Sequence, residues 1–169
     1  FYSITTPKFA AMAIRKVAEM GWKPTQYLSS VSVSVSAVLK PAGFENAKGV
    51  ISATYLRDPS DPKNHETKEM KEYLAFLKQY YPAGNPDDSL NVIGYSSAQT
   101  MEHVLRKAGD DLTRANIMKI AANMSMSLPM LYPGIEIKTG PDDFYPVEKM
   151  QPQQFDGTRY VPLGPVLGK

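Results

Sequence analysis

Helical spacing of apolar residues is the first pattern along the chain. Four apolar residues recur every three or four positions, with basic residues between them: Phe9, Ala13, Val17 and Met20. Before them, Thr5-Thr6-Pro7 offers a capping threonine and a proline in the first turn, and Gly21 offers a left-handed stop. This pattern predicts a helix over residues 7–20.

Short segments at residues 1–4 and 26–30 flank this helix and are expected to be strands, which gives a βαβ unit. The strict Val-Ser alternation of residues 31–36 alone is typical of a half-buried strand. No turn separates it from the preceding strand, so we favour a loop leading into a short helix that ends near Leu39. The β-rich segment 49–56 predicts the next strand.

Three more helices are predicted in the middle of the chain, over residues 66–80, from 86–89 to Gly109, and after a capping Thr113. Their apolar faces are expected to point inward. The inward positions are Met70, Tyr73, Leu74, Leu77 and Tyr80 in the first helix, Val92, Tyr95, Met101, Val104, Leu105 and Ala108 in the second, and Ile117, Ile120, Ala121 and Met124 in the third.

The last part of the chain changes to a β pattern. Residues 134–138 predict a short strand, and segments 150–155 and 158–163 flank Asp156-Gly157, a pair that favours a type I′ hairpin turn. The sequence therefore predicts an α/β protein that ends in an antiparallel hairpin.

Composition removes several classes of function. The 169 residues include 19 Lys and Arg against 17 Asp and Glu, a net charge of +2 that is too weak to suggest a nucleic-acid partner. The absence of cysteine excludes a disulfide scaffold, a thiolate nucleophile and a Cys-ligated zinc site. The longest apolar run, residues 9–14, is far shorter than the about 20 residues of a membrane-spanning helix. The first residues resemble neither an initiation site nor a signal peptide, so we expect a processed chain or a piece of a longer one.

One segment suggests hydrolysis. Gly94-Tyr95-Ser96-Ser97-Ala98 is one residue away from the G-x-S-x-G turn that exposes a nucleophilic serine. Such a serine needs a histidine within hydrogen-bond reach and an acid that orients this histidine, in the chain order Ser, acid, His. The only downstream histidine, His103, lies seven residues along the same expected helix, about 10 Å away. A serine hydrolase using Ser96 is therefore a remote alternative, and small residues packing a helix are the favoured interpretation.

A set of short motifs, in order along essentially the whole chain, resembles a known family. The motifs are Thr5-Thr6-Pro7-Lys8-Phe9, Trp22-Lys23-Pro24, Val38-Leu39-Lys40-Pro41-Ala42-Gly43, Lys48-Gly49-Val50-Ile51-Ser52-Ala53, Gly94-Tyr95-Ser96-Ser97-Ala98-Gln99 and Ala108-Gly109-Asp110-Asp111-Leu112-Thr113-Arg114. They resemble the C-terminal part of type I periplasmic substrate-binding proteins, the receptors of branched-chain amino acid type ABC transporters. The resemblance implies two α/β lobes, with parallel sheets flanked by helices, that hold a small ligand between them without a cofactor and without chemistry.

The resemblance also implies a domain organisation. Residues 1–52 would belong to the second lobe, 53–145 to the first lobe, and 146–169 would return to the second. The complete protein would be more than twice as long, so sheet edges and apolar faces would stay uncovered in this chain. It should therefore pair with the missing N-terminal half or with a domain-swapped second copy.

The ligand site follows from the same resemblance. It places Thr5, Thr6, Ser29, Ser30 and Val31 at the second-lobe wall of the cleft and Leu90 at the first-lobe wall. Amino acid receptors of this family carry an acid in the loop after the second strand, but this loop, residues 29–32, contains none. A buried ammonium without a counter-charge is costly, so we favour an aromatic or aliphatic organic acid over an amino acid.

The partner expected from the resemblance is an ABC permease in the membrane, with the receptor in the periplasm. A two-lobe sensor that regulates another protein is the alternative.

Overall fold

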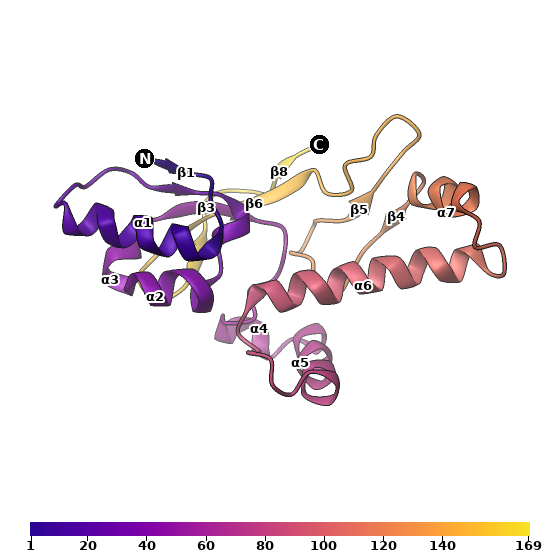
Figure 1. Cartoon of the computed structure of the whole chain (residues 1–169), viewed down its shortest axis with the longest axis horizontal. Helices are drawn as coiled ribbons and strands as arrows, with labels where there is room; N and C mark the ends of the chain where they lie inside the picture. The colour runs from indigo at the N-terminus through magenta and orange to yellow at the C-terminus, as the bar shows by residue number, and fades with distance from the viewer.

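The computed structural model describes residues 1–169 and shows an elongated α/β molecule (Figure 1). Its main sheet has six strands. The strands are β1 (Tyr2–Ser3), β2 (Tyr27–Leu28), β3 (Ile51–Thr54), β6 (Lys149–Phe155), β7 (Tyr160–Pro162) and β8 (Leu167–Gly168). The first three in the chain, β1, β2 and β3, run parallel, and β6 pairs antiparallel with β3, β7 and β8. The parallel sheet flanked by helices confirms the predicted fold class.

Three helices lie beside the parallel strands at the same end of the molecule (Figure 1): α1 (Pro7–Glu19), α2 (Lys40–Ala42) and α3 (Phe44–Ala47). Helix α1 connects β1 to its parallel neighbour β2, which confirms the predicted βαβ unit. The alternating Val-Ser segment forms a 3₁₀ turn at Ser30–Ser32 and a π-helix at Val35–Leu39. The expectation that this segment is not a strand is confirmed.

The other end of the molecule is mainly helical and includes a small two-stranded ribbon (Figure 1). Its elements are α4 (Pro62–His65), α5 (Lys68–Tyr80), α6 (Ser89–Ala108), α7 (Arg114–Ala121), β4 (Ser125–Met126) and β5 (Ile137–Lys138). Thr113 caps α7 as predicted, because its hydroxyl accepts a hydrogen bond from Asn116 N–H. None of the helices combines the length and the apolar character that crossing a membrane requires.

Two separate hydrophobic clusters hold these two ends. The first joins α1, the π-helix, α2, α3 and the sheet, and its largest fully buried members are Ile14, Leu39 and Phe155. The second joins α5, α6 and the segment around the β4–β5 ribbon, and its largest fully buried members are Tyr73, Met70 and Met130. Strands β3 and β6 pair antiparallel and extend from the sheet end of the molecule toward the helical end (Figure 1).

Several apolar side chains expected to point inward are exposed instead. The buried stripe of α1 consists of Ala10, Ala11, Ile14 and Val17, whereas Phe9 and Met20 are exposed. The buried stripe of α6 follows an i, i+4 row, and Met101 and Leu105 lie beside that row. Tyr80, at the end of α5, is also exposed. The spacing of apolar residues locates a helix. Which of those residues are buried depends on where the neighbouring elements pack against the helix.

The hairpin at Asp156-Gly157 forms, but not with the predicted turn. Phe155 pairs with Tyr160, so four residues connect β6 to β7. A type I′ turn needs positive φ at both central residues, and among these residues only Gly157 has it. The Asp156 carboxylate accepts hydrogen bonds from the N–H groups of Thr158 and Arg159, and these bonds stabilise the longer loop.

One face of the parallel strands is open. Leu28 is buried toward α1, whereas side chains on the opposite face are exposed: Tyr2, Ile4 and Tyr27. Tyr2 and Tyr27 stack against each other across the β1–β2 pair, with ring centroids 6.1 Å apart. Because β1 pairs only with β2, the sheet also ends in an unpaired edge there.

Candidate functional site

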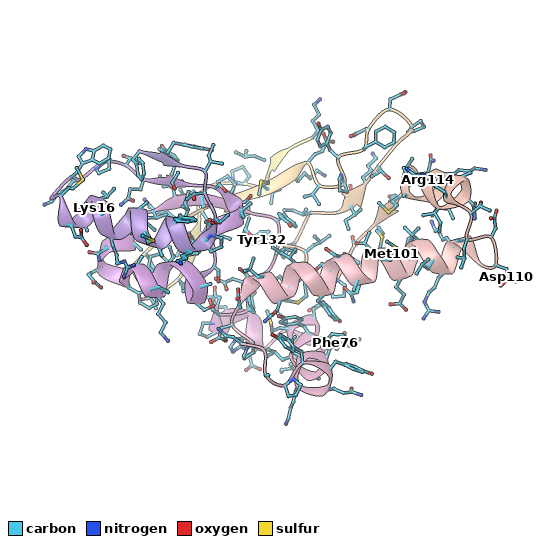
Figure 2. The ribbon with its side chains drawn as sticks, viewed as in Figure 1. Lys16, Phe76, Met101, Asp110, Arg114 and Tyr132 are labelled. Atoms are coloured by element: carbon cyan, nitrogen blue, oxygen red, sulfur yellow. The ribbon has the colours of Figure 1, made fainter.

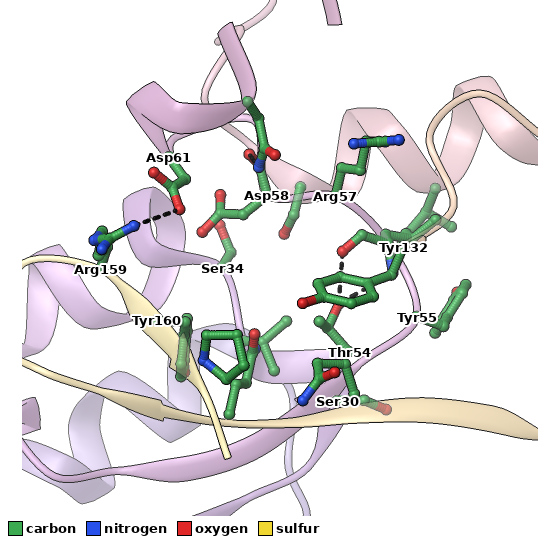
Figure 3. A pocket seen from close by; sticks show the side chains of 18 of the residues that line it. Ser30, Ser34, Thr54, Tyr55, Arg57, Asp58, Asp61, Tyr132, Arg159 and Tyr160 are labelled. Atoms are coloured by element: carbon green, nitrogen blue, oxygen red, sulfur yellow. Dashed lines mark hydrogen bonds and ion pairs between the residues drawn. The ribbon is translucent and has the colours of Figure 1, made fainter. Parts of the chain in front are cut away.

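A cavity of about 410 Å³ lies where β3 and β6 run from one hydrophobic cluster toward the other (Figure 3). This volume is within the range of small-molecule pockets. Five parts of the chain line it: the segment after β2, the end of β3 with the loop that follows, the start of α6, the segment at residues 132–133, and the β6–β7 hairpin. Tyr132 lies between the sheet end of the molecule and α6 (Figure 2).

An ion pair connects the hairpin to the loop after β3. Arg159 Nη1 lies 3.3 Å from Asp61 Oδ2, and both side chains are largely buried. Asp61 also caps α4, since its Oδ1 accepts a hydrogen bond from Lys63 N–H. The charge of Arg159 is therefore already balanced within the protein.

Asp58, in the same loop, is less well compensated. Its Oδ1 accepts hydrogen bonds from the N–H and the hydroxyl of Ser60, at 2.9 and 2.7 Å. No group bonds its Oδ2, and no Lys or Arg forms an ion pair with it. Burial raises the pKa of this carboxyl, and the nearby carboxylates of Asp61 and Asp87 raise it further against the lowering effect of Ser60.

The Tyr160 side chain is the second uncompensated group in the cavity wall. It is only 7% exposed, and its hydroxyl is buried without a hydrogen-bond partner. Burial raises the pKa of this phenol, and the negative charge of Asp58 raises it further. Asp58 and Tyr160 line the same cavity.

The opposite side of the cavity is aromatic. Figure 3 shows Asp58, Asp61, Arg159 and Ser34 gathered on one side and the ring of Tyr132 toward the other. Arg57 also lines the cavity, but its guanidinium is directed elsewhere and its Nε donates to the Pro129 carbonyl at 3.1 Å. The cavity therefore combines a polar side with an aromatic side.

The structure brings three of the six predicted site residues to this cavity. Ser30, Val31 and Leu90 line it, and Val31 and Leu90 are exposed. Ser29 does not line it, because its hydroxyl caps the 3₁₀ turn by accepting from Val31 N–H.

Thr5 and Thr6 are also outside the lining. The Thr5 carbonyl accepts a hydrogen bond from the Ser32 hydroxyl. Thr6 precedes α1, but its side chain makes no capping hydrogen bond. Ligand contact by any of the six residues stays a prediction.

The sequence analysis missed the polar side of the cavity. Asp58 and Asp61 lie in a segment that is recognisable only as a Pro- and Asp-rich loop, and Arg159 lies beside the hairpin turn. Only their charge and their position after strand ends could have marked these residues as part of a site. Neither property indicates that Asp61 and Arg159 form an ion pair.

The serine motif does not form a nucleophile turn. Ser96 lies within α6, 7% exposed, and its hydroxyl has no hydrogen-bond partner. His103 is on the same helix, and its Nε2 is also without a partner. No group of His, Asp and Glu side chains is arranged to hold a metal ion.

Residues 1–159 match the model of the periplasmic binding protein family. The chain belongs to this family. No curated protein matches it. Among solved structures, it is similar to a branched-chain amino acid ABC transporter protein from Thermus thermophilus with bound valine, with a TM-score of 0.81 and 16% identity over 99% of this chain and 45% of that one.

Two further structures have the same fold. One is a possible leucine/isoleucine/valine-binding protein from Rhodopirellula baltica, with a TM-score of 0.74 and 16% identity over 96% of this chain and 42% of that one. The other is a leucine-binding protein from Thermotoga maritima, with a TM-score of 0.66 and 15% identity over 99% and 44%. The present chain thus spans less than half the length of these proteins. The family, that of periplasmic binding proteins, supports a solute-binding role, and the solved structures show the shared fold.

Proposed function

We propose that this periplasmic binding protein family member is part of an extracytoplasmic receptor that captures a small organic ligand and delivers it to an ABC permease. The observation that carries the proposal is the cavity of about 410 Å³ between two separate hydrophobic clusters. A site placed between two packed units can close around a solute by a hinge motion, and the closed form is what a permease can recognise.

We assign residues 1–52 and 146–169 to one lobe and residues 53–145 to the other. Contacts between the two proposed lobes border the cavity. Arg159 pairs with Asp61, the Ser34 hydroxyl donates to Asp88 Oδ1 at 3.3 Å, and the Ser36 hydroxyl donates to the Asp87 carbonyl at 3.1 Å. Polar contacts of this kind break and re-form without loss of core packing, which suits opening and closing.

The ligand we propose is an amino acid or an aromatic or aliphatic organic acid. The aromatic side of the cavity suits an apolar body. The loop at residues 29–32 contains no acid, and this favoured an organic acid. However, the same cavity contains Asp58 from a different loop, so the lack of a counter-charge applies only to residues 29–32.

A thermal-shift screen of the full-length protein tests the capture of a ligand. Amino acids, aromatic acids and fatty acids are added separately, and a ligand that binds only the folded protein raises the Tm. We expect at least one of these classes to do so. Leu90→Arg, which places a large charged side chain at the cavity wall, should abolish the shift.

Leu105→Arg is the matched control for that variant. Leu105 lies on the same helix, is also exposed, and does not line the cavity, so this variant should retain the shift. No shift in any class, or equal loss in both variants, would contradict capture in this cavity. Delivery is tested separately, by asking whether the loaded receptor stimulates ATP hydrolysis by its permease in proteoliposomes.

A further inference from the structure

The outer face of α1 and the turn after it carry exposed apolar and basic side chains together. The buried stripe of this helix packs into the first hydrophobic cluster, so its opposite side is turned to solvent. Four large apolar residues on the solvent side are 47–66% exposed: Phe9, Met12, Met20 and Trp22. The basic residues beside them are also exposed: Lys8, Arg15, Lys16 and Lys23. We call these eight residues the α1 surface.

Helical spacing places the side chains of the α1 surface next to one another. One row along the solvent side of the helix repeats at intervals of three or four residues: Phe9, Met12, Lys16 and Met20. Trp22 is held at the end of the helix, because its N–H donates to the Val17 carbonyl at 3.2 Å. Its ring centroid lies 5.7 Å from that of Phe1. The row therefore ends at a tryptophan that the fold keeps in place.

The charge of this part of the chain differs from that of the rest. Residues 1–44 contain five Lys and Arg and a single acid, Glu19, whereas residues 45–169 contain 14 Lys and Arg against 16 Asp and Glu. Glu19 pairs with Lys16 at 3.1 Å. The three other basic residues of the α1 surface form no ion pair within the protein: Lys8, Arg15 and Lys23. Their positive charge is available to an external partner.

We propose that the α1 surface docks onto an anionic phospholipid bilayer. The negative potential of such a bilayer attracts basic side chains near it, and Trp rings suit the boundary between headgroups and acyl chains. Lys and Arg side chains can reach lipid phosphates while their apolar stems lie along apolar neighbours. A single helix presents a convex face, to which a fluid bilayer adapts, whereas a protein partner would have to supply a matching hollow.

This docking goes beyond solute capture and does not depend on it. No residue of the α1 surface lines the cavity, so the two can be tested separately. Figure 2 shows Lys16 on α1 at the sheet end of the molecule and Arg114 on α7 at the helical end. Docking through α1 brings the sheet end against the bilayer and leaves the cavity lining free.

Sedimentation of the full-length protein with lipid vesicles tests the docking. Vesicles of phosphatidylcholine mixed with phosphatidylglycerol are compared with vesicles of phosphatidylcholine alone. We expect binding to the anionic vesicles and much weaker binding to the neutral ones. Binding to the anionic vesicles should weaken as salt is added, because the Debye length falls from about 10 Å at 0.1 M to about 3 Å at 1 M.

The double variant Arg15→Gln/Lys23→Gln removes two unpaired charges of the α1 surface. Each basic side chain near an anionic surface contributes roughly fivefold in affinity, so this variant should weaken vesicle binding by about 25-fold. Lys78→Gln/Lys107→Gln is the matched control, because both lysines are exposed, form no ion pair and lie on α5 and α6. It changes the net charge equally and should bind as the unmodified protein does.

Equal binding to neutral and anionic vesicles, binding to neither, or equal losses in the two double variants would overturn the proposal. So would capture by permease-containing proteoliposomes without any binding to lipid alone, which would assign the α1 surface to an acidic protein partner. Arg15→Gln/Lys23→Gln should keep the thermal shift caused by a ligand, so a failure of docking is distinguishable from a failure of solute capture. Circular dichroism and cooperative melting show that each variant is folded.

Discussion

Asp58, in the cavity wall, is a residue whose negative charge opposes folding. Its pKa is raised in the folded protein because burial and the carboxylates of Asp61 and Asp87 disfavour its charged form. Arg57, Lys63 and Arg159 line the same cavity, but none of them forms an ion pair with it. The folded protein therefore binds a proton at this site more tightly than the unfolded chain does, and ionisation destabilises the fold.

Replacing Asp58 by Asn should consequently stabilise the unliganded protein near neutral pH. The variant has no charge to desolvate, and each 1 kcal/mol of added stability corresponds to roughly 2–4 °C in Tm for a protein of this size. The advantage should shrink as the pH falls through the raised pKa of Asp58, since the unmodified carboxyl then becomes neutral too. Melting curves of both proteins over a pH series measure this.

A constant difference between the two proteins at every pH would show that the carboxyl charge is not the cause. Asp111→Asn is a suitable comparison, because the Asp111 carboxyl is fully exposed and hydrogen bonds from Thr113 lower its pKa. Its loss should remove a favourable interaction, so any effect should have the opposite sign and fade at acidic pH.

At this scale the sequence predicted only part of the site. The family resemblance implied six site residues, and three of them, Ser30, Val31 and Leu90, line the cavity. The pair of Asp61 and Arg159 could not be predicted, because 98 positions separate the two residues and no periodic pattern connects them. Nor does any local pattern predict that Asp58 and Tyr160 line the same cavity.

A threonine precedes both α1 and α5, but only one of the two forms a capping hydrogen bond. Thr67 precedes α5, its hydroxyl accepts from Met70 N–H, and the same hydroxyl donates to the Asn64 carbonyl at the end of α4. Thr6 precedes α1 in the same way in sequence, but its hydroxyl makes no capping bond. Here Pro7 already lacks one of the N–H groups that a cap would satisfy.

Thr67→Ala should therefore destabilise the protein by about 1 kcal/mol, the usual cost of losing an N-cap hydrogen bond. Thr6→Ala should change the free energy of unfolding by less than roughly 0.5 kcal/mol, as is common for surface substitutions. Urea unfolding of the full-length protein measures both. Equal losses in the two variants would mean that the capping hydrogen bond is not what distinguishes the sites.

The elements themselves were largely predictable, since helix periodicity, capping residues and strand composition are local properties. What failed depends on the surroundings. Met101 and Leu105 look inward-facing in the sequence, yet nothing in the chain covers their side of α6. The turn at Asp156-Gly157 differs because Asp156 caps a four-residue loop with its carboxylate. Both outcomes need knowledge of contacts that a local pattern does not contain.

At the scale of the whole molecule, the open face of the parallel strands is the main exposed apolar surface. Tyr2, Ile4 and Tyr27 are 66%, 79% and 43% exposed and occur on one face of adjacent parallel strands. Monomeric proteins rarely expose connected apolar surface of this kind beside an unpaired strand edge. We proposed that residues 1–52 belong to a lobe, and such a face is where further elements of that lobe would pack.

The isolated 169-residue segment should therefore self-associate in solution. Burying apolar surface between two copies gives about 25 cal/mol for each Å² removed from water, and edge strands can pair as well. Light scattering across a concentration series should show a mass that rises above the monomer value of 18.7 kDa.

The double variant Ile4→Lys/Tyr27→Lys places charges on the open face and should shift the segment toward monomer, whereas Met118→Lys, at an exposed position on α7, should not. If the unmodified segment stays monomeric at all concentrations, its open face needs no partner, and the assignment of residues 1–52 to an incomplete lobe loses its physical basis.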